Sequence, residues 1–239
     1  MIISFLNQKG GCGKTTLALN FASYVARVLE RSPFDEVVLI ETDRQESLSY
    51  WHNTRLDSGK ECLQILSLQR VNALRSFKPS KKKLYVLDGG GIADDLCRAS
   101  IKLSDLVVIP IKASPMDIWS MAPITTWIKE RQEFTDGSPK SCYALSMTHL
   151  GSKLGKGTVG EFDGTDLDLI PGSIKDRVIY KSSAMQGLSV FDVTKDYTSN
   201  ELLARQIAEN EINYLATNIL SRVEVAIPDP IGIGGTCCD

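Results

Sequence analysis

Short apolar runs alternate along this chain with longer segments in which apolar residues recur every three or four positions. Runs of that length are typical of buried strands, and the longer segments have the period of amphipathic helices. We expect strands over residues 2–6, 36–41, 84–88, 106–111 and 142–147, with a weaker one near 167–170. We expect helices over residues 14–30, 45–57, 92–101, 116–134, 181–187 and 199–222.

This order of elements predicts an α/β fold, namely a doubly wound, mostly parallel sheet flanked by helices in a single domain. The last helix supports this fold, because one of its faces is apolar at helical spacing and carries Ala204, Ala208, Ile212, Leu215 and Ile219. We expect the domain to span residues 1–222. The tail, residues 223–239, contains prolines and several glycines and is expected to be peripheral.

Composition narrows the class of protein. Of 239 residues, 43% are hydrophobic but only 7% aromatic, an aliphatic bias that suits strands covered on both faces. The net charge of −2 means that any contact with nucleic acid must come from a local patch. The six cysteines show no zinc-binding spacing, which favours a reducing cytosol. We see neither a signal peptide nor a run of about 20 apolar residues that would span a bilayer.

The most informative segment lies between the first expected strand and the first expected helix, and it reads Lys-Gly-Gly-Cys-Gly-Lys-Thr-Thr over residues 9–16. A glycine-rich turn there lets successive backbone N–H groups point at a polyphosphate, and the helix dipole adds to the attraction. Lys14 would reach the β- and γ-phosphates, and the Thr15 hydroxyl would bind Mg²⁺. The usual loop has glycine where this chain has Gln8, and a second lysine, Lys9, opens the loop. The cofactors expected are ATP and Mg²⁺, and the nucleotide-binding residues are Lys9, Gly10, Gly11, Cys12, Gly13, Lys14, Thr15 and Thr16.

A loop with two lysines resembles the deviant Walker A signature of the ParA/MinD family of P-loop ATPases, and Ile3 to Asn20 is most similar to short ParA-type plasmid partition ATPases. Further motifs follow in the family's order. Residues 37–48 resemble its second-strand motif, residues 84–90 its Walker B strand, and residues 106–117 the next strand with its proline-bearing loop. The resemblance covers residues 1–222.

The resemblance implies roles for several side chains. Thr16 would contact the α-phosphate, and Asp88 would hold Mg²⁺ through water, although a carboxylate ending a strand can also merely cap the next turn. Asp43 would position the attacking water and contact Mg²⁺ through water. Lys9 would cross a dimer interface to the partner subunit's nucleotide, where its charge offsets that of the leaving phosphate; the alternative is a solvated lysine beside a turn.

Two substitutions depart from the family pattern. Glu41 stands in place of an aspartate and is one methylene longer, about enough to shift a water-mediated contact with Mg²⁺. Arg44 stands in place of a proline, which should leave the loop less rigid. We therefore expect nucleotide binding to be retained and ATP hydrolysis to be slow, with Lys9, Lys14 and Asp43 as catalytic residues.

The resemblance also implies contact with DNA. Lys175, Arg177 and Lys181 fall in a segment similar to the family's DNA- or partner-facing region, and Lys195, Lys153 and Lys156 could extend the patch. Binding would be to phosphates, without sequence preference and sensitive to salt. The alternative is a set of solvated lysines.

The function implied is a Mg²⁺-dependent ATPase of plasmid or chromosome partition. It would form a homodimer on binding ATP, bind DNA non-specifically in the nucleoid of a bacterial or archaeal cell, and respond to a ParB-like centromere-binding adaptor. One alternative is a weakly or non-hydrolysing ATP-dependent DNA-binding scaffold or repressor. Another is a MinD-like positioning ATPase, but that would need a basic amphipathic helix where residues 228–239 are glycine-rich and acidic. We therefore expect no membrane partner.

Overall fold

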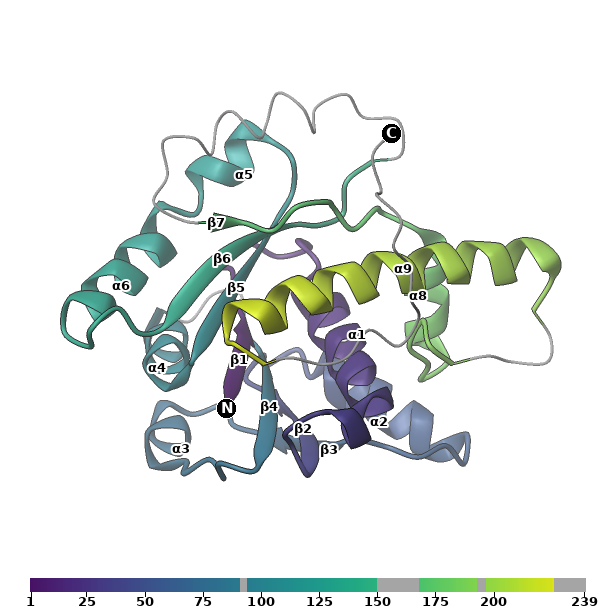
Figure 1. Ribbon diagram of the computed structural model, residues 1–239, viewed down its shortest axis with the longest axis horizontal. Helices are drawn as coiled ribbons and strands as arrows, with labels where there is room; N and C mark the ends of the chain where they lie inside the picture. The colour runs from purple at the N-terminus through teal and green to yellow at the C-terminus, as the bar shows by residue number, and fades with distance from the viewer. Residues whose placement is uncertain (91–93, 150–167, 193–196, 226–239) are drawn as a thin grey trace.

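The computed structural model describes residues 1–90, 94–149, 168–192 and 197–225. A seven-stranded sheet runs through its centre in the order β3-β2-β4-β1-β5-β6-β7, and every pairing between these strands is parallel (Figure 1). The strands are β1 (Ile2–Phe5), β2 (Glu36–Glu41), β3 (Gln64–Ser67), β4 (Lys83–Asp88), β5 (Leu106–Ile111), β6 (Lys140–Leu145) and β7 (Asp168–Leu169). The predicted fold class is confirmed.

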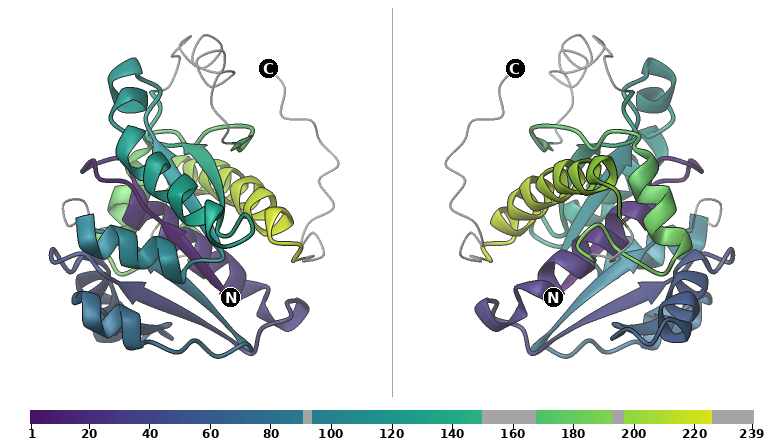
Figure 2. Two further views of the ribbon diagram at one scale, coloured as in Figure 1. Left: turned by 90° about the vertical axis from the view of Figure 1, so that its left-hand side faces the viewer. Right: turned by 90° about the vertical axis from the view of Figure 1, so that its right-hand side faces the viewer.

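Helices cover both faces of the sheet (Figure 2). One face packs against α1 (Lys14–Arg27), α2 (Ser47–Asp57), α8 (Val178–Met185) and α9 (Ser199–Arg222). The other face packs against α3 (Val71–Ser76), α4 (Asp94–Leu103) and α6 (Ala122–Glu133), with the short α5 (Pro115–Trp119) at its edge. Alternate residues of each strand enter the two cores, which is why the strands read as continuous apolar runs. A 3₁₀ turn, Leu29–Arg31, follows α1.

Some predicted elements differ from the structure. The predicted helix 116–134 is two helices, α5 and α6, because Pro123 in the first turn of α6 restricts the residue before it and favours a fresh helix start. The helix predicted to begin at residue 45 begins at Ser47, after Glu46 with a left-handed φ of 53°. The helix predicted over 181–187 is α8, which begins earlier and ends before Gly187, whose φ is 67°. The edge strand β3 and the short helix α3 were not predicted.

The position of β1 determines where the functional site lies. The chain leaves β1 toward β2 on one side and later reaches β5 on the other, so the direction of winding reverses at β1. Ligands of doubly wound sheets bind beyond the carboxyl ends of the strands at such a point. The glycine-rich turn follows β1 at this end of the sheet.

Candidate functional site

The turn between β1 and α1 has the backbone of a phosphate-binding loop. Gly11 and Gly13 have φ angles of 69° and 89°, which L side chains rarely adopt. A β-carbon on Gly13 would also lie 2.4 Å from Oγ of Ser146, so the loop requires glycine there for space as well. Gly13 occupies the N-cap of α1, where no side chain caps the helix. The first N–H groups of α1 therefore remain available to an anion.

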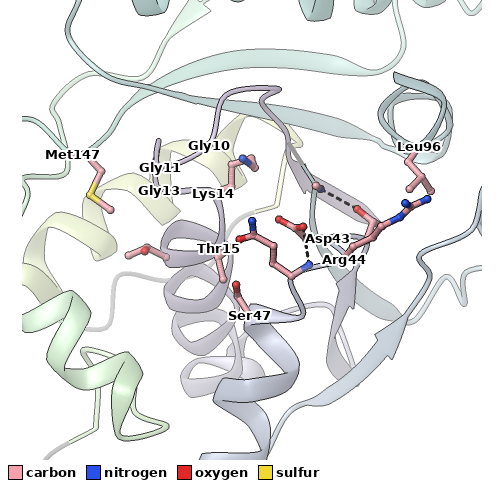
Figure 3. Close-up of a pocket in the computed structure, with 14 residues that line it drawn as sticks. Gly10, Gly11, Gly13, Lys14, Thr15, Asp43, Arg44, Ser47, Leu96 and Met147 are labelled. Atoms are coloured by element: carbon pink, nitrogen blue, oxygen red, sulfur yellow. Dashed lines mark hydrogen bonds between the residues drawn. The ribbon is translucent and has the colours of Figure 1, made fainter. Parts of the chain in front are cut away.

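A pocket of about 620 Å³ opens at this loop. Lys14 and Thr15 reach it from the start of α1 and Asp43 from the end of β2, while Met147 lies on the opposite side from Arg44 and Leu96 (Figure 3). The structure thus brings together the predicted loop and the residues after β2. The pocket is lined by Gly10, Gly11, Gly13, Lys14, Thr15, Thr16, Thr42, Asp43, Arg44, Gln45, Ser47, Gly90, Leu96 and Met147.

The two lysines of the loop make different contacts. Lys14 is buried, and its ammonium donates to the Lys9 carbonyl at 3.0 Å. The Lys9 ammonium lies 2.5 Å from Oδ1 of Asp117 in α5, with 42% of the Lys9 side chain exposed and 8% of that of Asp117. In this single chain Lys9 is therefore held by an acid of its own subunit. Sequence reasoning missed Asp117, although it had singled out the loop that carries it.

Asp88 ends β4 beside the loop and is fully buried. Neither of its carboxylate oxygens has a hydrogen-bonding partner among the described residues. Burial raises the pKa of Asp88 to about 7, with a further upward contribution from Asp43 and Glu41 and an opposing one from Thr15 and Lys14. A buried acid without partners beside the Thr15 hydroxyl fits the coordination of a cation through water. The site thus has a suitable place for Mg²⁺.

The segments after β2 and β4 are tied together. The Thr42 hydroxyl donates to the Asp88 carbonyl at 3.0 Å and accepts from the Gly90 N–H at 3.3 Å. A β-carbon on Gly90 would lie 3.2 Å from Cα of Asp43, so these segments approach as closely as glycine permits. Asp43 accepts from the Gln45 N–H at 3.0 Å, which turns the chain away after the carboxylate. The segments that carry Asp43 and Asp88 are therefore held near each other.

Glu41 caps a helix in this structure, a role that the sequence did not predict. Its side chain is fully buried and accepts hydrogen bonds from the N–H groups of Leu48 at 2.7 Å and Ser49 at 3.3 Å, and from the Ser49 hydroxyl. These are first-turn donors of α2, so Glu41 caps that helix from the end of β2. The extra methylene thus serves a helix cap. The expected effect of Glu41 on a water-mediated contact with Mg²⁺ stays a prediction.

The segment expected to contact DNA is engaged within the chain. The Arg177 guanidinium donates to Glu211 of α9 at 3.0 and 2.7 Å, and Tyr180 donates to the same carboxylate at 3.0 Å. Lys181 pairs with Asp176 at 2.8 Å and remains largely exposed. The backbone N–H of Lys175 also approaches Glu211. Arg177 fixes α8 to α9 here and would have to leave Glu211 to reach DNA. Lys153, Lys156 and Lys195 lie outside the described residues.

Other candidate chemistry is limited. Cys12, Cys62, Cys97 and Cys142 are free thiols. Within the described ranges no group of three or more histidine, cysteine or acidic side chains could hold a metal ion. Among the described helices, none combines the length and the apolar character needed to cross a membrane.

Met147 is a functional candidate that sequence reasoning missed. It has a φ of 54°, which is strained for a residue with a side chain, and it lines the pocket next to Gly13. The sequence gives one indication of this position: Met147 follows β6, a buried strand whose carboxyl end lies on the same side of the sheet as that of β1.

Comparisons with known proteins agree with this geometry. Residues 3–228 match the CbiA family, described as the CobQ/CobB/MinD/ParA nucleotide binding domain. The maintenance of carboxysome distribution protein A of Halothiobacillus neapolitanus is 22% identical over 222 residues, which cover 91% of this chain and 95% of that protein.

Solved structures resemble the fold closely. The complex of a Cyanothece McdA variant with ATP has a TM-score of 0.68 at 15% identity, covering 92% of this chain and 96% of that one. A putative plasmid partition protein of Borrelia burgdorferi B31 bound to AMPPNP has a TM-score of 0.61 at 18% identity, covering 91% and 99%. The similarity extends over nearly the whole length of each protein.

Proposed function

The chain belongs to the CobQ/CobB/MinD/ParA nucleotide-binding family, and we propose that it is a cargo-positioning ATPase of the ParA type whose cargo is plasmid or chromosomal DNA. It is a P-loop ATPase that uses ATP and Mg²⁺. The observation that carries the proposed two-subunit ATPase cycle is the loop itself, in which Lys14 lines the pocket and Lys9 does not. One lysine serves the chain's own nucleotide and the other is available to a second subunit.

Each residue of the site has a role in this proposal. The loop amides and Lys14 bind the β- and γ-phosphates, and Thr16 binds the α-phosphate. Asp43 orients the attacking water. Lys9 of each subunit neutralises charge on the nucleotide of the other, as an arginine finger does. Thr15 and, through water, Asp88 and Asp43 would hold Mg²⁺, which when bound neutralises phosphate charge.

In this proposal, Lys9 links ATP binding to the formation of the dimer. Because Lys9 of one subunit would contact the nucleotide of the other, ATP binding and dimer formation each favour the other. A dimer doubles the number of basic contacts to DNA phosphates, so binding to DNA becomes bivalent and tighter. Hydrolysis, slow alone and stimulated by a ParB-like adaptor, would release the dimer. This cycle would run in the cytoplasm on the nucleoid.

A second candidate cargo is a protein body. The similarity to the carboxysome distribution protein over 91% of this chain favours it. In that case the ATPase cycle and the DNA contacts are the same, but the adaptor binds a protein assembly instead of a centromere. A third candidate function is that of a scaffold, which binds DNA when ATP is bound but does not hydrolyse the ATP.

The deciding experiment measures ATP turnover by the purified protein alone, with DNA, and with DNA plus the product of the adjacent gene. We expect slow turnover alone and stimulation by the combination. An adaptor that binds a specific DNA sequence supports DNA cargo, and one that binds none supports a protein body. ATP-dependent DNA binding without turnover in any mixture supports the scaffold.

Two substitutions distinguish the roles of Lys9 and Lys14. Lys14→Ala should abolish nucleotide binding. Lys9→Ala should bind ATP with an affinity within about 3-fold of wild type, yet lose the ATP-dependent dimer and the stimulated turnover, because its contact is made only between subunits. Turnover of Lys9→Ala at the wild-type rate would rule out the two-subunit mechanism.

A further inference from the structure

Lys112 follows β5 directly, at the same edge of the sheet as the phosphate-binding loop. Its ammonium lies 4.0 Å from the position that a β-carbon on Gly11 would occupy, and among the described residues other than Gly11 and its two chain neighbours no other atom lies that close to this position. The side chain is half-buried. The N–H of Ser114 donates to the Lys112 carbonyl at 2.8 Å, which turns the backbone at this point. Lys112 is thus a third lysine at the loop.

Its surroundings differ from those of the other two lysines. Lys9 has the Asp117 carboxylate and Lys14 has the Lys9 carbonyl. The Lys112 ammonium makes no ion pair or hydrogen bond with any residue in the part of the chain that the structure describes. Burial raises the pKa of the Cys12 thiol, and the charges of Lys14 and Lys112 oppose that rise. The charge of Lys112 therefore reaches the loop.

A partly buried cation without an anion carries a desolvation cost that a bound anion offsets. The backbone of Gly10 and Gly11 forms the upper rim of the nucleotide pocket (Figure 3), and Lys112 stands against Gly11. We propose that Lys112 is an additional nucleotide-binding residue, which contacts the terminal phosphates of the ATP bound in its own subunit. Since Gly11 lines the pocket of the same chain, the contact needs no second subunit. The inference requires only nucleotide binding and does not depend on the cargo.

The test is the affinity for triphosphate against diphosphate. A cation that serves the terminal phosphates should matter more for AMPPNP than for ADP, because the additional phosphate adds charge beside it. We expect Lys112→Gln, which keeps most of the length of the side chain but not its charge, to weaken AMPPNP binding roughly 10-fold and ADP binding less than about 3-fold. Isothermal titration calorimetry with Mg²⁺ measures both without turnover.

Matched variants make the result decisive. Lys112→Arg keeps the charge and should retain AMPPNP affinity within about 3-fold. Lys102→Gln removes an exposed lysine in the last turn of α4, at the opposite edge of the sheet, and should change neither affinity. An unchanged ratio of the two affinities in Lys112→Gln, with its unfolding temperature intact, would overturn the proposal. Lys14→Ala in parallel reports on the nucleotide site itself, so that a failure of the site is not mistaken for a failure of Lys112.

Discussion

At the scale of single residues, the environment of Asp88 conflicts with the charge of its carboxylate. It is fully buried beside Asp43 and Glu41, and its two oxygens have no partner among the described residues. Such a carboxylate destabilises the nucleotide-free chain when it is ionised. A bound cation would relieve this conflict, and the acid would then lower folding stability in exchange for affinity at the site.

The pKa of Asp88 allows a prediction about stability. Because the pKa is raised from an ordinary 3.8 to about 7, its contribution to stability is fully present below pH 3.8 and is lost as the pH rises through 7. Asparagine at this position is neutral throughout. The unfolding temperature of Asp88→Asn without nucleotide should therefore rise relative to wild type by roughly 5 °C between pH 5 and pH 8.

Thermal unfolding followed by circular dichroism checks this directly. Asp57→Asn, which changes an exposed carboxylate at the end of α2, is the matched control and should show no such trend. A difference between Asp88→Asn and wild type that stays constant from pH 5 to pH 8 would contradict the assignment.

At the scale of elements, the start of α2 depends on a residue outside the helix. Its N-cap residue, Glu46, has a left-handed backbone and makes no side-chain cap, while Glu41 from β2 accepts from Leu48 and Ser49. Glu41→Ala should lower the free energy of unfolding by about 2–4 kcal/mol, since it leaves buried donors without an acceptor. Glu41→Gln keeps one acceptor and should cost less. Chemical denaturation measures both, with the exposed Glu61→Ala as control.

The same variants test the earlier interpretation of Glu41. If the residue acted on Mg²⁺ and not on the helix, Glu41→Ala would change the Mg²⁺ dependence of ATP binding while leaving the denaturation midpoint unchanged. That result would contradict its role as a cap.

Elements with a strong local pattern could be predicted from the sequence, and those set by tertiary packing could not. The β1-loop-α1 unit is encoded locally by an apolar run, glycines and a helical period, and α9 was predicted with its bounds. The edge strand β3 is short and only half-buried, so it carries a weak pattern. The contact of Lys9 with Asp117 joins segments distant in sequence, and no local signal reports it. Glu41 lies only seven residues from Leu48, but their contact depends on how the chain turns between β2 and α2, which the apolar pattern does not specify.

At the scale of the whole molecule, the segment after β5 connects the nucleotide loop to the outer surface. Asp117 in α5 holds Lys9, while the neighbouring apolar side chains Met116 and Trp119 are 70% and 71% exposed. In the proposed dimer, we expect a second subunit that receives Lys9 to approach this surface and to cover those side chains. The chain thus holds Lys9, which we propose to act between subunits, beside apolar area that is open to solvent.

This arrangement predicts that Asp117 restrains dimer formation. Lys9 must leave the buried carboxylate of Asp117 before it reaches a second subunit. This step leaves the Asp117 charge buried and unpaired, and its free-energy cost opposes dimer formation. Asp117→Asn removes the charge and should lower the protein concentration needed for the AMPPNP-dependent dimer by about 3- to 10-fold, as measured by sedimentation velocity. Asp176→Asn, which breaks the exposed pair with Lys181, should leave that concentration unchanged. Weaker dimerisation of Asp117→Asn would instead place Asp117 among the contacts of the assembled dimer, and the Lys9 pair would then stabilise assembly rather than oppose it.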